Sequence, residues 1–284
     1  MNKLPPWKIP LLLLPGIGII VGFIGIVVFM VFAQSFGYFR ATGENIFSTE
    51  YWQIVMNNPI FWRSTFYSLK VSTLGAIGAV MLAYPFALWL RKPFKGNLAI
   101  TGILRAPMFV PGLVAAFLFV NFISYHGFLN EIFVRLGIFD EPKTMQNDPY
   151  GISVIILQIW KNMPFALLLL SGAVKGISDE VLYAAQDLGA GRIARLWKII
   201  FPMTITILQA AFIIIFIGAV GDFAFNTVAG PRNIYSIAQL MYSVAYLEYE
   251  TNQAAVIAVM LMIVSLTGAL FLAFILKVIA VRRR

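Results

Sequence analysis

Six long apolar stretches dominate the chain, and short polar segments separate them. The stretches cover residues 10–32, 61–90, 100–125, 150–174, 201–223 and 254–280. Each is long enough to cross a bilayer, which takes about 20 residues in a helix that rises ~1.5 Å per residue. Because lipid offers no hydrogen-bond partner to an open backbone, each stretch is expected to be helical. The pattern predicts an all-α polytopic membrane protein with six transmembrane helices.

Composition agrees with a membrane protein and excludes several kinds of site. Of the 284 residues, 60% are hydrophobic and 12% are charged, whereas soluble domains carry about twice that charged share. The chain has no cysteine and a single histidine, His126, which excludes disulfides, cysteine-based metal or redox sites and multi-histidine metal centres. The net charge of +9 lies at the ends of the apolar stretches, so we expect it to set membrane topology and not to bind nucleic acid.

The first apolar stretch is expected to remain in the mature chain. Lys3 and Lys8 precede it, but it is longer than a signal-peptide core and is followed by no small-residue cleavage site. We therefore divide the chain into residues 1–60, holding the first span and first external loop, and residues 61–284, holding the other five spans.

Charge is distributed unevenly between alternate connections. One set contains Lys3, Lys8, Arg91, Lys92, Lys95, Lys175, Arg192, Arg195, Lys198, Lys277, Arg282, Arg283 and Arg284. The other set contains Arg40, Arg135, Lys143 and Arg232 together with Glu44, Glu50, Glu131, Asp140, Glu141, Asp148, Glu248 and Glu250. The excess of Lys and Arg predicts that the first set lies in the cytoplasm. Both termini are then cytoplasmic, which agrees with an even number of spans.

A charged segment at 178–202 interrupts this apolar chain on the predicted cytoplasmic side. Ser178 can cap a helix whose first turn carries Asp179 and Glu180, where negative charge favours the helix dipole. Ala184 and Ala185 give this helix a low-relief surface that suits a groove on another protein. Its predicted apolar face consists of Val181, Leu182, Ala185 and Leu188.

Two glycines end this first helix, and a second helix is predicted at 192–200. Gly189 and Gly191 indicate a turn, and Pro202 suits the first turn of the next span. The residues alone leave two interpretations open. The pair is either an interfacial loop that joins two spans or a docking surface for a partner protein.

Within this segment, Tyr183-Ala-Ala-Gln-Asp-Leu-Gly-Ala followed by Ile-Ile-Phe-Pro at 199–202 resembles the EAA loop of ABC importer permeases. These are the MetI-like inner-membrane components of binding-protein-dependent transport systems. Trp160-Lys-Asn-Met-Pro-Phe165 is similar to the span that precedes the loop in that family. The resemblance runs from about Ser64 to the C-terminus. It implies a permease core at 61–284, a coupling loop at 178–202 and a multi-pass protein of the bacterial inner membrane.

The resemblance implies that the loop is a coupling helix docked in a cleft of a cytoplasmic ATPase. The implied docking residues are Asp179, Glu180, Tyr183, Ala184, Ala185, Asp187, Gly189 and Arg192. Tyr183 occupies the position of the family's glutamate. Either Asp179, Glu180 or Asp187 replaces that charge, or the contact differs between the two permease halves.

No motif of catalysis occurs in the chain. It lacks a G-x-x-x-x-G-K-[ST] phosphate loop, a G-x-S-x-G elbow and an HExxH pair. We expect a non-catalytic subunit without a bound cofactor, with ATP and Mg²⁺ held by a separate ABC ATPase dimer. The resemblance further implies an extracytoplasmic solute-binding protein and a second permease subunit, for which a paralogue is preferred to an identical copy.

Polar residues inside predicted spans are candidates for the translocation pathway. Lys161 and Asn162 lie near the middle of a span, beside Pro164, which is expected to break the helix locally and turn them towards a wet cavity. For Lys161, a structural pair with Asp222 or another polar neighbour is an equal alternative. Asp222, near the outer end of its span, could attract a cation. The pathway candidates are Gln158, Lys161, Asn162, Gln209 and Asp222.

The class of transported solute is predicted only from a resemblance to one branch of the family. The loop sequence, Gly221-Asp-Phe223 and the segments 34–38 and 58–64 resemble the spermidine/putrescine-type branch. A polyamine or similar small cationic solute is therefore expected, and a sugar-type permease is the alternative. A secondary transporter driven by an ion gradient is a further alternative, although only one proline break, at Pro164, is visible where such folds often have a matched pair.

Overall fold

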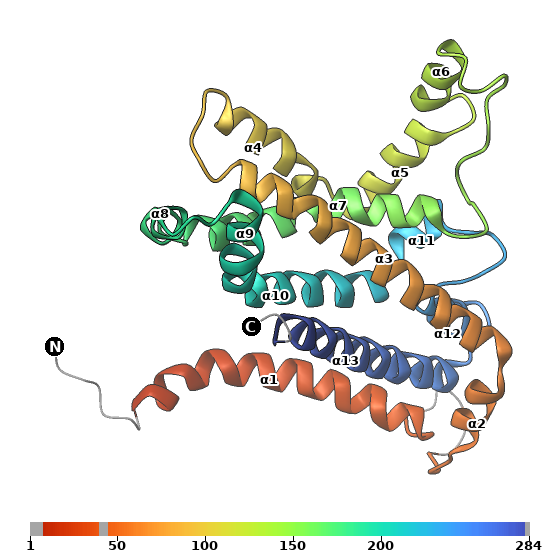
Figure 1. Cartoon of the computed structure of the whole chain (residues 1–284). Helices are drawn as coiled ribbons and strands as arrows, with labels where there is room; N and C mark the ends of the chain where they lie inside the picture. Colours follow the sequence, from red (N-terminus) through yellow and green to blue (C-terminus); the bar gives the residue numbers. More distant parts are fainter. Residues whose placement is uncertain (1–7, 40–44, 282–284) are drawn as a thin grey trace. The chain divides into compact units, whose positions relative to one another are not determined.

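The computed structural model describes residues 8–39 and 45–281, with side chains described at 12–39 and 45–274. Lys3, Arg40, Glu44 and the three terminal arginines of the charge pattern lie outside the described residues. Every regular element in the described part of the chain is a helix (Figure 1). The prediction of an all-α fold is confirmed.

Six helical segments among the described residues are long and apolar enough to cross a membrane. The elements are α1 (Lys8–Ser35), α2 (Glu50–Asn57), α3 (Pro59–Trp89), α4 (Asn97–Arg105), η1 (Ala106–Phe109), α5 (Gly112–Ile123), α6 (Phe128–Arg135), α7 (Ile152–Lys175), α8 (Asp179–Asp187), α9 (Arg192–Arg195), the π turn η2 (Leu196–Ile200), α10 (Phe201–Val220), α11 (Ala224–Ala229), α12 (Ile237–Tyr246) and α13 (Thr251–Val281).

The third predicted span, 100–125, is wrong as a single helix. It consists of α4, the 3₁₀ turn η1 and α5, with Val110 and Pro111 in extended conformation between the last two. Proline cannot donate a backbone hydrogen bond, and Pro107 and Pro111 both fall in this short region. The third membrane-crossing candidate accordingly begins after the interruption and covers Gly112–Arg135.

The predicted break at Pro164 is also wrong. The helix α7 runs without interruption through Pro164, which is buried in its interior. Membrane helices tolerate an internal proline when neighbouring groups satisfy the freed backbone. The interruption of the helical path thus lies directly before the third membrane-crossing candidate and not within the fourth.

The chain divides into two compact units, the first formed by residues 1–61 and 240–262. In this unit the Asn252 side-chain amide donates to the carbonyl of Gln34 at 2.7 Å and ties α13 to the end of α1. Gly37, at φ +92°, makes the turn after α1, where an added Cβ would lie 2.5 Å from the Ile46 carbonyl. The predicted segments 1–60 and 61–284 remain a prediction, since this unit also contains part of the C-terminal region.

The second unit, residues 62–239 and 263–284, contains the helices that surround α7. Its α10 packs along α7, and α11 packs against α5 and α7. A buried cluster joins α3, α5, α7 and α11 and consists of Tyr67, Val71, Ala116, Val154, Leu157, Phe225 and Ala229. Burial of these apolar side chains stabilises the arrangement.

Helices α3 and α7 approach each other closely at two glycines. A Cβ added to Gly75 would lie 2.8 Å from the Cβ of Gln158, and one added to Gly78 would clash with Ile159. Small residues permit this approach between membrane helices. The contact fixes the position of α7, from which the α8–α9 connection follows.

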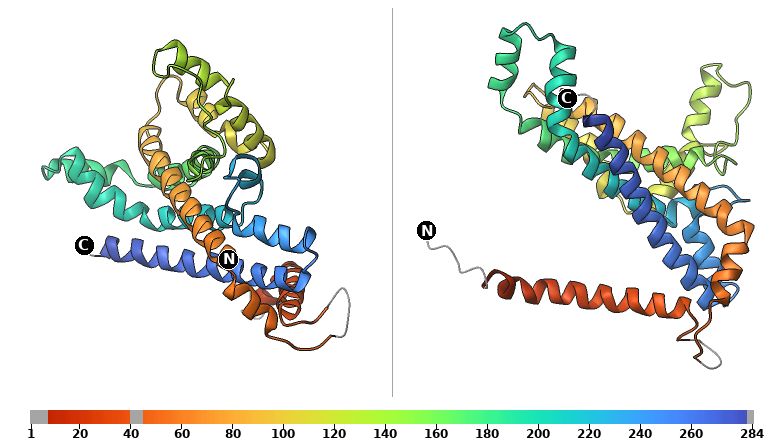
Figure 2. Two further views of the ribbon diagram at one scale, coloured as in Figure 1. Left: turned by 90° about the vertical axis from the view of Figure 1, so that its right-hand side faces the viewer. Right: turned by 60° about the horizontal axis from the view of Figure 1, so that its bottom comes forward.

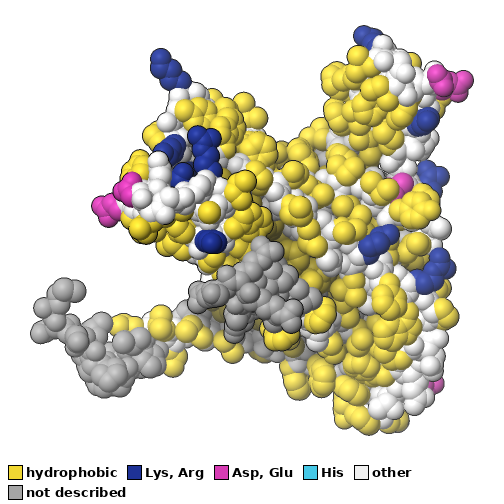
Figure 3. All heavy atoms as spheres, in the orientation of Figure 1, with side chains coloured by type: hydrophobic (Ala, Val, Ile, Leu, Met, Phe, Trp, Pro, Cys, Tyr) yellow, Lys and Arg dark blue, Asp and Glu magenta, His cyan; other side chains and the backbone are white. Residues whose placement is uncertain are grey.

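Within this second unit, α8–α9 and α6 extend from opposite ends, as Figures 1 and 2 show. In Figure 3, Lys and Arg side chains are scattered over the right-hand side and also form a group over the end that carries α8 and α9. This end corresponds to the connections that the charge pattern predicts to be cytoplasmic.

Candidate functional site

Helix α8 forms where the sequence predicts it. Ser178 precedes it in extended conformation but makes no side-chain cap, and Asp179 and Glu180 occupy the first turn. Leu182 is buried, whereas Leu188 is 89% exposed. The predicted apolar face is therefore only partly packed against the protein.

Gly189 ends α8 in a left-handed turn. Its φ is +83°, its N–H donates to the Gln186 carbonyl at 2.8 Å, and the Ala190 N–H donates to the Ala185 carbonyl at 2.9 Å. This pair of bonds is the Schellman motif, which satisfies the last carbonyls of a helix. Gly191, in contrast, has an ordinary φ of −65°.

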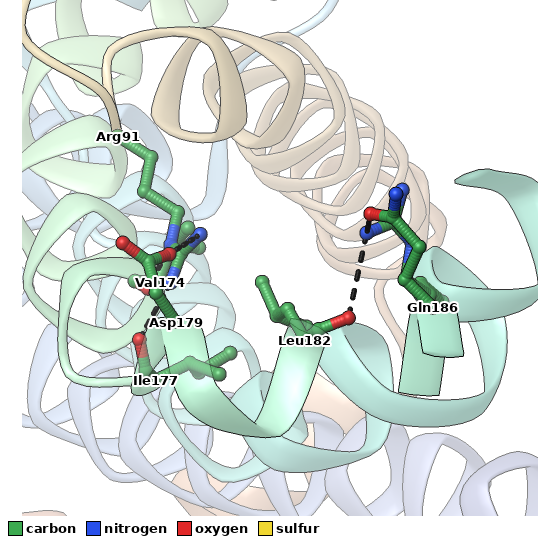
Figure 4. Close-up of polar contacts among 7 residues, drawn as sticks. Arg91, Val174, Ile177, Asp179, Leu182 and Gln186 are labelled. Atoms are coloured by element: carbon green, nitrogen blue, oxygen red, sulfur yellow. Dashed lines mark hydrogen bonds and ion pairs between the residues drawn. The ribbon is translucent and has the colours of Figure 1, made fainter. Parts of the chain in front are cut away.

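Arg91, two residues after the end of α3, holds the start of α8 (Figure 4). Its guanidinium forms an ion pair with Asp179 at 2.8 Å. It also donates to the carbonyls of Val174 at 3.2 Å and Ile177 at 2.6 Å, at the end of α7. The Arg91 side chain is 12% exposed. Three chain segments are thus joined by one planar, permanently charged group.

A second arginine joins the two helices of the connection. The Arg195 guanidinium donates to the Gln186 side chain at 2.8 Å and to the Leu182 carbonyl at 3.4 Å. The sequence predicts that the second helix ends at residue 200, before the next span. In the structure it does not end there. It continues through η2 into α10, with the π turn one turn ahead of Pro202. Motion of α9 would therefore be passed directly to a membrane-crossing helix.

Tyr183, at the position of the family's glutamate, faces a cation of its own chain. The Lys92 ammonium lies 6.0 Å from the centre of the Tyr183 ring, within the range of a cation–π contact. Both residues line a cavity of about 260 Å³, together with Arg192. The surroundings of Tyr183 are consequently basic.

Exposed side chains cover the outer surface of the connection. Glu180, Ala184 and Asp187 are exposed, and neither Glu180 nor Asp187 belongs to an ion pair in the described part of the chain. Large hydrophobic side chains accompany them, namely Val181, Tyr183, Leu188, Ile193 and Trp197. A surface of this kind can accept a partner without rearrangement of the core.

Two pathway candidates lie together on α7. The Asn162 amide donates to the Gln158 side chain at 2.7 Å and to the Gln158 carbonyl at 2.9 Å. Gln158 is 2% exposed and packs against Gly75. In this conformation Gln158 is a packing residue at the α3–α7 contact.

Lys161 contacts neither Asp222 nor any other carboxylate among the described residues. Its ammonium donates to the carbonyls of Pro107 at 2.7 Å, Met108 at 3.2 Å and Val110. These carbonyls belong to the interruption between α4 and α5. Lys161 thus connects the unbroken fourth span to the interruption that precedes the third.

Asp222 caps the short helix α11. Its carboxylate accepts the Phe225 N–H at 3.0 Å, and its carbonyl accepts the Asn226 amide at 2.9 Å. The Asn226 side chain in turn accepts the Tyr67 hydroxyl at 3.0 Å. The structure therefore gives Asp222 a clear local role.

Gln209 lies apart from the other pathway candidates. Its amide donates to the Ala273 carbonyl at 3.4 Å, between α10 and α13. The five candidates do not form one site in this conformation.

A carboxylate outside the spans organises the start of α7. Asp148 accepts the N–H groups of Ile152 at 2.7 Å and Ser153 at 2.8 Å. Partial burial favours a higher pKa for this carboxyl, but hydrogen bonds from Ser153, Ile152 and Tyr150 outweigh it and lower the pKa below its ordinary value. Asp148 is ionised and structural at neutral pH.

Sequence reasoning missed three features of the site. Arg91 entered only as a topological charge, although its place directly after a span is a usable signal. The pairing of Lys92 with Tyr183 joins residues 91 positions apart and has no local signal. The interruption at 106–111 did have one, since Pro107 and Pro111-Gly112 are typical of a break.

Comparison with protein families identifies the fold's relatives. Residues 75–284 match the model of the family described as binding-protein-dependent transport system inner membrane component. The chain belongs to this family. Its members are components of transport systems, and this permease is a multi-pass protein of the inner membrane with a MetI-like fold.

Two permeases whose names state a solute are each similar to part of this chain. The spermidine/putrescine transport system permease protein PotB of Escherichia coli is 27% identical over 179 residues, a match that covers 62% of this chain and 64% of PotB. The trehalose/maltose permease protein MalF of Thermococcus litoralis is 28% identical over 163 residues, covering 56% and 55%. Less than two thirds of each relative is matched, and the two differ in solute.

A solved structure extends the likeness to nearly the whole chain. A bacterial alginate ABC transporter, crystallised with an alginate pentasaccharide-bound periplasmic protein, has a chain that aligns with a TM-score of 0.75. The alignment covers 93% of this permease and 92% of that chain at 20% identity. At this identity the likeness concerns the fold.

Proposed function

We propose that this permease is the transmembrane subunit of an ATP-driven ABC importer. It forms half of the translocation pathway, and a second permease subunit, a paralogue in our proposal, supplies the other half. The observation that carries the proposal is the α8–α9 connection. Arg91 and Arg195 brace it from within, while its hydrophobic side chains, Leu188 above all, remain exposed.

The coupling surface is the exposed side of α8 and the start of α9. An ABC ATPase dimer, which binds ATP and Mg²⁺, docks there. Gly189 and Arg192 set the turn, and Tyr183, Ala184 and Ala185 supply a low-relief contact. Support comes from the exposure of Tyr183 and Ala184 and from the unbroken helix that leads from α9 into α10.

The charged part of that contact falls to Glu180 and Asp187. Of the three carboxylates able to replace the family's glutamate, Asp179 is engaged with Arg91 inside the chain. Glu180 and Asp187 are exposed, and the described residues offer them no ion pair. They are therefore the carboxylates available to a partner.

The solute is a polyamine or a similar small organic cation, delivered by an extracytoplasmic binding protein. The similarity to PotB supports this class. Gln158, Lys161, Asn162, Gln209 and Asp222 remain the proposed pathway residues, with rearrangement of α7 needed to expose Gln158. A sugar-type importer is the second candidate, because the trehalose/maltose permease MalF is similar at 28% identity.

Uptake by the reconstituted transporter tests this function. The partners that co-purify with the tagged permease are placed in liposomes, and entry of labelled putrescine and of labelled maltose is measured. We expect putrescine uptake that requires internal ATP and the binding protein and persists when the proton gradient is collapsed. ATP-driven maltose uptake alone would establish the sugar candidate. Uptake driven by the proton gradient without ATP would refute the importer proposal.

A further inference from the structure

The interruption between α4 and α5 exposes backbone acceptors. Val110 and Pro111 are extended between η1 and α5. Because Pro111 has no N–H, the Pro107 carbonyl loses the donor that an α-helix would supply. It accepts the Val110 N–H at 3.3 Å instead. The Met108 and Val110 carbonyls accept no backbone bond across the interruption in the described residues.

One ammonium group satisfies all three carbonyls. Lys161 Nζ donates to Pro107, Met108 and Val110, so each of its three N–H bonds has an acceptor. These carbonyls also close the C-terminal end of α4–η1, where the helix dipole favours a cation. The three oxygens, here called the carbonyl cradle, hold the charge without a carboxylate.

A second lysine, Lys70, does not have three carbonyl partners. Lys70 Nζ donates to a single carbonyl, that of Tyr150, at 2.7 Å. Lys161 is half-buried, and the residues around the cradle are accessible, with Met108 41% and Phe109 81% exposed. The cradle is therefore formed by the chain's own backbone and is reachable from outside it.

We propose that the carbonyl cradle of Pro107, Met108 and Val110 is a binding site for a primary ammonium group, filled by Lys161 in this conformation and available to a solute's ammonium when Lys161 withdraws. The identity of that solute rests on the proposed function. Carbonyls only accept hydrogen bonds, so the cradle favours a charged group with three donors over a neutral hydroxyl. Unwound carbonyls bind cations in the same way in other transport proteins with discontinuous helices.

Chemical rescue of Lys161→Ala in the purified full-length chain tests the cradle. The substitution leaves a gap that n-propylammonium fits. We expect propylammonium chloride to raise the Tm of this variant saturably, by about 2–4 °C. Tetramethylammonium chloride has the same charge and no N–H, so it should not. Putrescine should act like propylammonium.

Lys70→Ala is the matched control, because it removes a lysine bound to one carbonyl only. In that variant, propylammonium and tetramethylammonium should have equal effects. If Lys161→Ala aggregates, propylammonium during solubilisation should restore monodisperse protein and tetramethylammonium should not.

Equal action of the two salts on Lys161→Ala, or the same rescue in Lys70→Ala, would overturn the cradle as an ammonium site. Failure of putrescine to act where propylammonium does would overturn its role for the solute. The measurement involves no ATP, partner or transport. Its failure thus leaves the importer proposal standing, and failure of ATP-driven uptake leaves this result intact.

Discussion

Among single residues, the two glycines of the α8–α9 turn differ in a way that can be measured. Gly189 has φ +83° and Gly191 has φ −65°, and an added Cβ would meet no atom within 4 Å at either position. Both positions therefore have room for a Cβ, and only the backbone conformation differs between them. A left-handed conformation costs a side-chain-bearing residue about 1–2 kcal/mol.

We predict that Gly189→Val impairs coupling while Gly191→Val does not. Valine is strained at Gly189 and unstrained at Gly191, so only the first variant should distort the end of α8. ATP-driven uptake should fall several-fold in Gly189→Val at an unchanged amount of inserted protein. Equal uptake by the two variants would show that the geometry of this turn is irrelevant to transport.

Residues such as these show what local sequence can reveal. Gly189 was predictable, because a turn after a periodic segment has a local signature. Lys161 and Arg91 were visible as charges, but their partners include backbone carbonyls 51 and 83 positions away, respectively. Only the packing of helices decides such contacts. For the same reason Gln158, a polar candidate by sequence, proves to be a buried packing residue.

Among the elements, the position of α8 depends on the clamp formed by Arg91. Its removal leaves two carbonyls and the Asp179 carboxylate without this donor, a loss of about 1–3 kcal/mol in total. Arg135, paired with Glu131 at 3.7 Å on the surface of α6, is a suitable comparison. Exposed pairs at this spacing contribute only about 0.3–0.5 kcal/mol.

We predict that Arg91→Ala frees α8 and Arg135→Ala leaves it unchanged. Hydrogen exchange of the α8 amides should accelerate roughly tenfold or more in Arg91→Ala, since 1.4 kcal/mol corresponds to a factor of ten. Exchange as slow as in the unaltered chain would mean that the clamp does not hold α8.

The helix boundaries show where the hydropathy of the sequence predicts a helix correctly and where it does not. The long apolar runs of α1, α3, α7 and α13 were predictable because a span needs a minimum length. The third span was misplaced because its hydropathy continues across an interruption in the backbone. Pro164 was wrongly predicted to break its helix, because a helix packed against its neighbours tolerates one internal proline. Short helices such as α2, α6, α11 and α12 have no span-length signal.

At the scale of the whole molecule, the charge pattern predicts that the α8–α9 end of the second unit faces the cytoplasm. The chain contains no cysteine, so single cysteines can report it without background. Leu188 is 89% exposed beside the coupling surface, and Leu136 is 68% exposed after α6.

A membrane-impermeant thiol reagent should therefore label Leu136→Cys in intact cells and Leu188→Cys only after the membrane is opened. Labelling is read by mass shift on a gel. The reverse order would invert the topology and remove the ATPase from the α8–α9 connection.

The central claim is that an ABC ATPase docks on exposed α8, and capture of that ATPase by the tagged permease tests it most directly. Leu188→Glu places a charge in the docking surface without disturbing a buried contact, and Leu136→Glu makes the same change at the other end. The account predicts that the unaltered permease and Leu136→Glu retain the ATPase in detergent, while Leu188→Glu loses most of it. Retention of the ATPase by Leu188→Glu, or its absence from the unaltered permease, would contradict the account.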